Sequence, residues 1–191
     1  MKVCIITEGT AKTGYGHLSR CLAIYQGFEE KGILPNFIAN CDVSGKQVLE
    51  DIQIENFDWI DDSERLLKMI HGSDIVIIDS YLAELALYEK ISNISKRCAY
   101  LDDTLRLKYP PGVIINGAVG AEGLSFQKAN GYDLLLGLEY TPLRREFWDN
   151  NVNPSLKSQT DVLITIGAQD YDELSIKVLD LLLKSFPKYS Y

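Results

Sequence analysis

The chain has 191 residues, of which 46% are hydrophobic and 24% charged, values typical of a globular domain. This length suits one full-sized domain and is short for two. Nineteen Lys and Arg against 27 Asp and Glu give a net charge of −8. Such a charge argues against non-specific binding to nucleic acid or to anionic membranes, because both need a positive field.

The first residues and the cysteines indicate a cytoplasmic protein. Only four apolar residues, 3–6, precede polar Thr7 and Glu8, whereas a signal peptide needs an apolar run of roughly 7–15 residues and a membrane span about 20. The four cysteines are scattered, with no CxxC spacing. We expect buried free thiols rather than disulfides or zinc ligands.

Short apolar runs alternate with longer amphipathic segments along most of the chain. Strands are predicted at 3–7, 36–39, 56–60, 75–79, 98–102, 113–116, 134–137 and 162–167, and helices at 16–31, 44–51, 62–71, 84–95 and 172–186. Several strands are continuously apolar, which is typical of parallel strands covered on both faces. The alternation therefore predicts an α/β fold, a Rossmann-like parallel sheet with helices on both faces.

One change in composition divides the chain. Residues 149–160 are polar, rich in Asn and contain Pro154, which indicates a linker between residues 1–148 and 161–191. The last segment holds one strand and one helix, too little for a domain core. We therefore expect a two-domain protein of which residues 161–191 are the first βα unit of the second domain. Alternatively, this unit packs onto the first domain or associates with another copy.

A glycine-rich loop follows the first predicted strand and leads into the first predicted helix. The loop is not the dinucleotide-binding fingerprint, because Ser19 stands where the third glycine would be. Gly14 and Gly16 still let the backbone approach a ligand at a helix N-terminus, where free N–H groups favour anions. His17 lies in the first turn, and Arg20, three residues later, shares its face. A histidine here serves in packing as often as in binding.

Polar residues also end three later strands. They are Asp79, Ser80 and Tyr81; Asp102 and Asp103; and Asn116. Because parallel α/β sheets bind ligands beyond the carboxyl ends of their strands, we expect these side chains on the same side of the sheet as His17. His71, near the end of a predicted helix, is expected to lie elsewhere and is given no role.

The run Thr-Gly-Tyr-Gly-His-Leu-Ser-Arg-Cys-Leu at 13–22 resembles the GxGHxxRCL signature of the PseG/SpsG family. That family comprises the UDP-2,4-diacetamido-2,4,6-trideoxy-β-L-altropyranose hydrolases of pseudaminic acid synthesis and the spore coat polysaccharide biosynthesis proteins. The resemblance continues in order through residues 77–81, 101–103, 115–116, 135–140, 143–147 and 162–167, followed by Asp170. It implies a GT-B fold, in which two Rossmann-like domains face each other across a cleft and the second holds most of the UDP.

The resemblance also implies a reaction. A UDP-sugar would be hydrolysed at its anomeric carbon by C–O cleavage with inversion, with His17 as the base and Tyr81 lining the sugar pocket. The other predicted substrate-binding residues are Gly14, Gly16, Arg20, Asp79, Asp103 and Asn116. No metal or cofactor is needed if backbone N–H groups and the helix dipole meet the charge of UDP. Glu8, Asp102 or Asp103 would orient the imidazole, and the sequence does not choose among them.

Two departures from the family pattern keep other functions open. Ile6 stands where the family usually carries Arg, and its Gly-Gly-Ser/Thr-Asp turn reads Gly-Ala-Gln-Asp at 167–170. One alternative is a GT-B glycosyltransferase that uses the same base on an acceptor hydroxyl. Another is a non-catalytic module that binds a sugar or a partner. Taken alone, the 191 residues are expected to fold and to be close to inactive.

Overall fold

The computed structural model describes residues 1–49, 51–124, 131–148, 162–165 and 173–186. They belong to two compact units, Met1–Trp148 and Asp149–Tyr191. The division falls where the sequence places the start of a linker, and the predicted linker itself, 149–160, lies outside the described residues.

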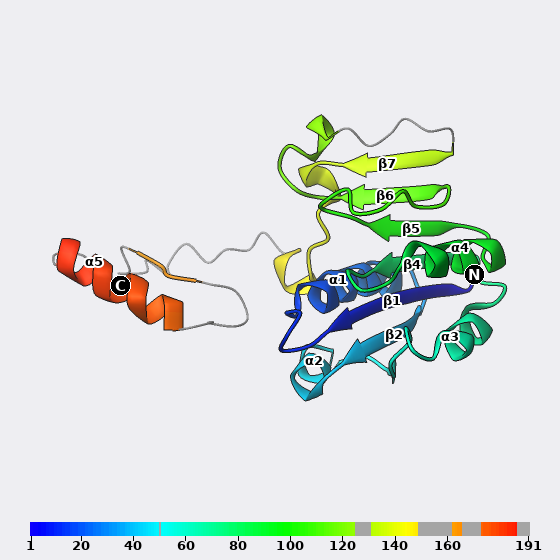
Figure 1. The fold of residues 1–191 in the computed structure, drawn as a ribbon, viewed down its shortest axis with the longest axis horizontal. Coiled ribbons are helices and arrows are strands. Elements are labelled where there is room, and N and C mark those ends of the chain that lie inside the picture. The colour runs from blue at the N-terminus through cyan, green and yellow to red at the C-terminus, as the bar shows by residue number, and fades with distance from the viewer. Residues whose placement is uncertain (50, 125–130, 149–161, 166–172, 187–191) are drawn as a thin grey trace. The chain divides into compact units, whose positions relative to one another are not determined.

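The first unit is built on one sheet of seven parallel strands in the order β3-β2-β1-β4-β5-β6-β7 (Figure 1). They are β1 (Val3–Gly9), β2 (Asn36–Cys41), β3 (Ile54–Asn56), β4 (Ile75–Asp79), β5 (Cys98–Leu101), β6 (Gly112–Asn116) and β7 (Tyr132–Leu136). The predicted Rossmann-like α/β fold is confirmed. The chain runs outward from β1 to β3 and then returns to β4 on the other side of β1. This reversal of strand order is where such sheets open a crevice for ligands.

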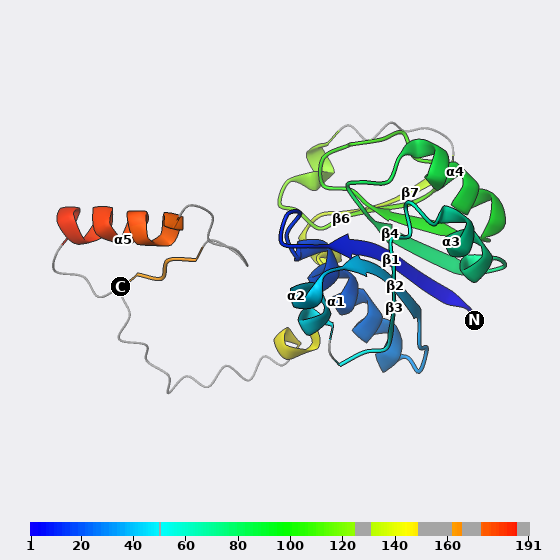
Figure 2. The same cartoon turned by 60° about the horizontal axis from the view of Figure 1, so that its bottom comes forward.

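Helices cover both faces of the sheet (Figure 2). On one face lie α1 (Gly16–Glu30) and α2 (Val43–Val48), and on the other α3 (Ser63–Ile70) and α4 (Leu85–Ile94). Several strands contain continuous apolar runs because successive residues enter different layers: Ile5 packs with Leu18 and Leu22 of α1, whereas Ile6 packs in the layer of α3 and α4. Three short 3₁₀ helices follow β6 and β7: η1 (Ala121–Gly123), η2 (Leu138–Tyr140) and η3 (Arg145–Phe147).

Two predicted strands differ from the structure. The strand predicted at 56–60 is β3, and it ends at Asn56. The residues after it form a turn whose apolar side chains pack into the core. Trp59 is fully buried there, and its Nε1 donates to the backbone oxygen of Thr7 at 2.8 Å. For the strand predicted at 162–167, residues 162–165 have no regular structure, and 166–167 lie outside the described residues.

The second unit contains α5 (Leu174–Ser185), which begins two residues later than predicted. None of the described residues of α5 is buried, although the helix carries several large apolar side chains. The proposed self-association through residues 161–191 stays a prediction. In the first unit all four cysteines are free and buried, which confirms their predicted state.

Candidate functional site

The candidate site lies at the carboxyl ends of β1 and β4, the two central strands. Their register pairs Thr7 with Asp79, the last residue of β4, and β1 continues two residues further to Gly9. Glu8 follows Thr7 in β1, and Ser80 and Tyr81 follow Asp79. Neighbouring parallel strands therefore deliver two carboxylates and an aromatic ring to one point.

Two glycines allow α1 to start beside these strand ends. Gly14 has a φ of +82°, a left-handed conformation that side chains rarely adopt, in a turn in which its N–H donates to the oxygen of Thr10 at 2.8 Å. At Gly9, a Cβ would lie 2.5 Å from Cγ of Leu18. The missing side chain at Gly9 thus lets α1 pack closely against the end of β1, with His17 as its second residue.

His17 and Asp79 form a hydrogen-bonded pair. Nδ1 of His17 lies 2.6 Å from Oδ1 of Asp79, and Asp79 is fully buried. Burial would raise the pKa of Asp79, but hydrogen bonds from His17 and Arg20 outweigh it and hold the pKa below its usual value. The ionised carboxylate accepts the Nδ1 proton, so the lone pair of the neutral imidazole is on Nε2. Nε2 has no hydrogen-bond partner among the described residues.

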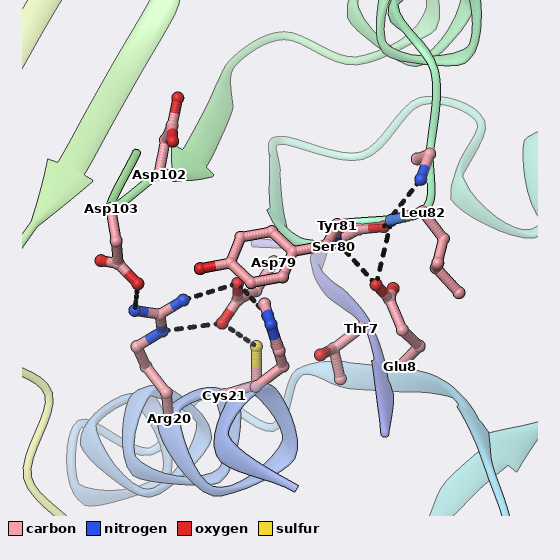
Figure 3. A network of polar contacts seen from close by, with 12 residues as sticks. Thr7, Glu8, Arg20, Cys21, Asp79, Ser80, Tyr81, Leu82, Asp102 and Asp103 are labelled. Atoms are coloured by element: carbon pink, nitrogen blue, oxygen red, sulfur yellow. Dashed lines mark hydrogen bonds and ion pairs between the residues drawn. The ribbon is translucent and has the colours of Figure 1, made fainter. Parts of the chain in front are cut away.

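Arg20 is bound by two carboxylates at once (Figure 3). Its Nε and Nη2 donate to Oδ2 and Oδ1 of Asp79, each at 2.8 Å, and Nη1 donates to Oδ2 of Asp103 at 2.6 Å. Burial alone would lower the pKa of Arg20, but these two partners raise it above its ordinary value. The Cys21 thiol lies 3.9 Å from Asp79, and burial raises its pKa well above the usual range, so it remains a neutral thiol.

The ring of Tyr81 packs against the imidazole of His17. Its ring meets the His17 ring edge-on, with 4.4 Å between centroids and 84° between planes. Glu8 fixes the backbone beneath it: Oε1 accepts N–H from Tyr81 at 2.8 Å and from Leu82 at 3.3 Å (Figure 3). Burial raises the pKa of Glu8, although these N–H groups partly oppose the rise. Glu8 therefore orients the loop that carries Tyr81.

Arg106 also supports the loop that carries Tyr81, a role that the sequence did not reveal. Its Nη2 donates to the backbone oxygens of Ser80 at 3.1 Å and Ala83 at 2.9 Å. Asp102 in turn accepts the backbone N–H of Arg106 at 2.9 Å and that of Thr104. No motif or spacing marks Arg106, because its role depends on a loop that follows a different strand.

The carboxylate that orients His17 is thus Asp79. The three carboxylates that the sequence offered for this role, Glu8, Asp102 and Asp103, were the wrong candidates, since Glu8 and Asp102 bind loop backbone and Asp103 binds Arg20. Asp79 was predicted to touch substrate, but its oxygens are already bound by protein donors, and we assign it the orienting role.

The other predicted residues are spread along the same edge or away from it. Asn116 ends β6 and is buried, its Oδ1 accepting the N–H of Ala118 at 2.9 Å. Gly16 begins α1, and a Cβ there would meet nothing within 4 Å. His71 follows α3, and its backbone oxygen accepts from Lys2, the residue before β1, at the amino ends of the strands. It lies away from the site, as expected.

A pocket of about 490 Å³ adjoins the buried cluster. Arg20 and Asp103 line it together with Gly16, Ser19, Gly117, Ala118, Thr141, Pro142, Leu143, Arg144 and Phe147. Arg145 holds the last of these segments to α1, donating from its backbone N–H to Gln26 at 2.8 Å and from Nη2 to Glu29 at 2.6 Å. The sequence did not predict this pocket, although the family resemblance extends over residues 143–147, three of which line it.

Comparison with known proteins finds a distant relative whose description names no function. No family model matches the chain. A protein of Methanocaldococcus jannaschii, described as uncharacterized protein MJ1062, is 29% identical over 196 residues that cover 96% of this chain and 40% of the relative. The chain thus spans about two fifths of the length of this curated relative.

The described residues contain neither a metal site nor a membrane-spanning helix. Within them, no three His, Cys, Asp or Glu side chains come together as a metal site. The helices among them are all too short or too polar to span a bilayer.

Proposed function

We propose that the protein hydrolyses a UDP-sugar in the synthesis of a surface polysaccharide or a related acidic sugar, with His17 as the base. The observation that carries the proposal is the 2.6 Å contact between Nδ1 of His17 and the buried Asp79. It leaves Nε2 to accept a proton at the carboxyl edge of the sheet, where α/β proteins bind ligands. The substrate class comes from the resemblance of residues 13–22 to the PseG/SpsG signature.

The proposed chemistry follows from the protonation states of the site. Nε2 removes a proton from water as the oxygen attacks the anomeric carbon. The C–O bond to the diphosphate breaks, and UDP leaves with the bonding electron pair. The imidazolium formed at His17 is then stabilised by ionised Asp79, 2.6 Å from Nδ1. Tyr81, a phenol that is neutral near pH 7 and whose pKa partial burial raises further, places its aromatic ring beside the base.

A glycosyltransferase is the second candidate, and the pocket beside Arg20 is the observation that favours it. Both reactions need room for the UDP-sugar, but a hydrolase adds only a water, whereas a transferase must also seat an acceptor. A volume of about 490 Å³ lies within the range of about 300–1,000 Å³ of small-molecule sites. The same base would then remove the proton of an acceptor hydroxyl.

The test is turnover of UDP-sugars by the complete gene product in water enriched in ¹⁸O. We expect UDP release without any acceptor, with ¹⁸O at the anomeric hydroxyl of the sugar and none in UDP. His71→Ala serves as a matched control and should turn over like the parent. Strict dependence on an acceptor would replace hydrolysis by transfer. Label in UDP, or no turnover of any nucleotide sugar, would overturn the proposal.

A further inference from the structure

The guanidinium of Arg20 bridges a buried carboxylate and a partly exposed one, with a different nitrogen for each bond. Nε and Nη2 bind the two oxygens of Asp79, and Nη1 binds Asp103. The side chain of Asp103 is 32% exposed, while that of Asp79 is fully buried. Only a planar fork of donors can make all three bonds at once, which lysine cannot imitate.

The contacts of Asp79 connect Arg20 to His17. Oδ1 accepts from both His17 Nδ1 at 2.6 Å and Arg20 Nη2 at 2.8 Å. The position of this oxygen is therefore fixed from two sides. If Asp79 took up a proton, that proton could face Nδ1, and the imidazole would carry its own proton on Nε2 instead. The atom that accepts a proton at the open edge would then be lost.

We propose that Arg20 is a positioning residue: it keeps Asp79 ionised and in place, and thereby fixes Nε2 of His17 as the proton-accepting atom. Asp103, bound to Nη1, holds the guanidinium in the orientation in which Nε and Nη2 reach the two oxygens of Asp79. The inference rests on the proposed function only in giving Nε2 a catalytic purpose. The arrangement of protons is a property of the chain itself and is measurable without turnover.

Loss of Arg20 has a predictable electrostatic result. Asp79 would keep His17 as its principal partner, and the pair would bind one more proton up to a higher pH than in the parent. Whether that proton lies on Oδ1 of Asp79 or on Nδ1 of His17, Nε2 is then protonated and accepts no further proton. The charged and titratable groups around His17 are Asp79 from β4, Arg20 and Cys21 from α1, Tyr81 from the loop after β4, and Glu8 from β1. Among these, Arg20 alone is a cation that opposes protonation of His17.

The experiment is a long-range ¹⁵N–¹H NMR titration of the histidines in the 191-residue chain. The sequence contains only His17 and His71, so the exposed His71 provides an internal reference in every spectrum. In the parent, His17 should show the Nδ1–H tautomer above its titration midpoint. In Arg20→Gln the midpoint should move to higher pH by about 1–3 units, the effect of a charge at this range, and the His71 signals should stay unchanged.

Two further variants keep the proposal testable if Arg20→Gln does not fold. Arg20→Lys keeps the charge and loses the fork, so the midpoint should move less while both tautomers appear. Asp103→Asn weakens the bond to Nη1 of Arg20. The His17 midpoint should then move to higher pH, as in Arg20→Gln, but by a smaller amount. A folded Arg20→Gln, or folded Arg20→Lys and Asp103→Asn, with His17 signals like those of the parent would overturn the proposal.

An activity profile separates this inference from the proposed function. In the complete gene product, the acid limb of the pH profile of kcat/KM should move to higher pH in Arg20→Gln, with the alkaline limb unchanged. If the parent shows no turnover, the proposed hydrolase activity is contradicted, but the NMR result for Arg20 still stands. If the parent shows turnover and the His17 signals of Arg20→Gln are unshifted, the role of Arg20 is contradicted and the proposed hydrolase activity stands.

Discussion

The carboxyl ends and the amino ends of the parallel strands, the carboxyl edge and the amino edge of the sheet, each carry an aspartate with basic partners, but the two aspartates differ in burial. At the carboxyl edge, Asp79 is fully buried between His17 and Arg20. At the amino edge, Asp74 accepts from the backbone N–H of Lys2 and from Nζ of Lys96, both at 2.7 Å. The Asp74 side chain is 30% exposed and that of Lys96 is 74% exposed.

The difference shows what burial adds to an ion pair. In water, exposed charges are screened, and holding two long side chains together costs entropy, so such pairs contribute little. A carboxylate without access to water must instead find its partners in the protein, and each of them gains a fixed position and protonation state. The carboxyl edge thus combines a histidine with a defined free nitrogen, whereas His71 at the amino edge contributes its backbone oxygen.

Asp79→Ala should have the largest effect. Removing the carboxylate leaves Arg20 and His17 without their shared partner, and loss of one member of a buried pair costs about 3–5 kcal/mol. Urea unfolding of the 191-residue chain measures this, and Asp79→Asn, which keeps the shape, should lose less. A loss below about 1 kcal/mol, the level of exposed pairs, would erase the contrast between the two edges.

His17→Ala tests the proposed base. Turnover by the complete gene product should fall by about 10²–10⁴-fold, the usual contribution of a positioned general base. Circular dichroism should show an unchanged fold. His71→Ala is the control from the opposite edge and should retain full turnover. Near-native turnover in His17→Ala would show that the base lies elsewhere.

Much of the fold was readable from the sequence because it depends on local pattern. Continuous apolar runs bounded by polar residues marked β4 at residues 75–79 and placed His17, Asp79 and Tyr81 at one edge. The rule fails where apolar residues serve the core without forming a strand. Trp59 was read as part of a strand, but it reaches the core from a turn after β3.

The partner of His17 was not readable because it depends on register and side-chain direction. Four carboxylates lie at or just after strand ends at this edge, Glu8, Asp79, Asp102 and Asp103, and the register that pairs Thr7 with Asp79 brings Asp79 within hydrogen-bond distance of His17. The roles of Arg106 and of residues 141–147 could not be predicted from the sequence for the same reason. Each depends on loops from distant strands meeting in space, which has no periodic signal along the chain.

Glu8→Gln tests a buried carboxyl that lacks a cationic partner. Burial raises its pKa in the folded chain, so the folded state binds the proton more tightly than the unfolded state. Glu8 therefore costs stability as pH rises from the unfolded pKa, about 4.3, through the raised folded value. Gln keeps an oxygen for the N–H groups of Tyr81 and Leu82 without the charge.

The stability difference between Glu8→Gln and the parent should accordingly grow in favour of the variant as pH rises. Each pKa unit of difference between the states corresponds to about 1.4 kcal/mol. Chemical unfolding at a series of pH values from 4 to 8 gives the curve. A difference that stayed constant with pH would mean that the carboxylate is as well solvated in the folded chain as in the unfolded one.

Asp74→Asn, at the amino edge, should have the smallest effect. Hydrogen bonds from Lys96 and from the backbone of Lys2 lower the pKa of Asp74, so its stabilising contribution is present above the unfolded pKa. It is lost as pH falls through the folded value. Because the pair is exposed, salt should screen it. We expect the urea midpoint of the variant at neutral pH to match the parent within error in 0.5 M NaCl, with a small deficit only at low salt.

For Asp79→Ala the deficit should persist at both salt concentrations, because no mobile ion reaches the buried carboxylate. A salt-independent loss in Asp74→Asn would show that the two edges do not differ in the way their burial indicates.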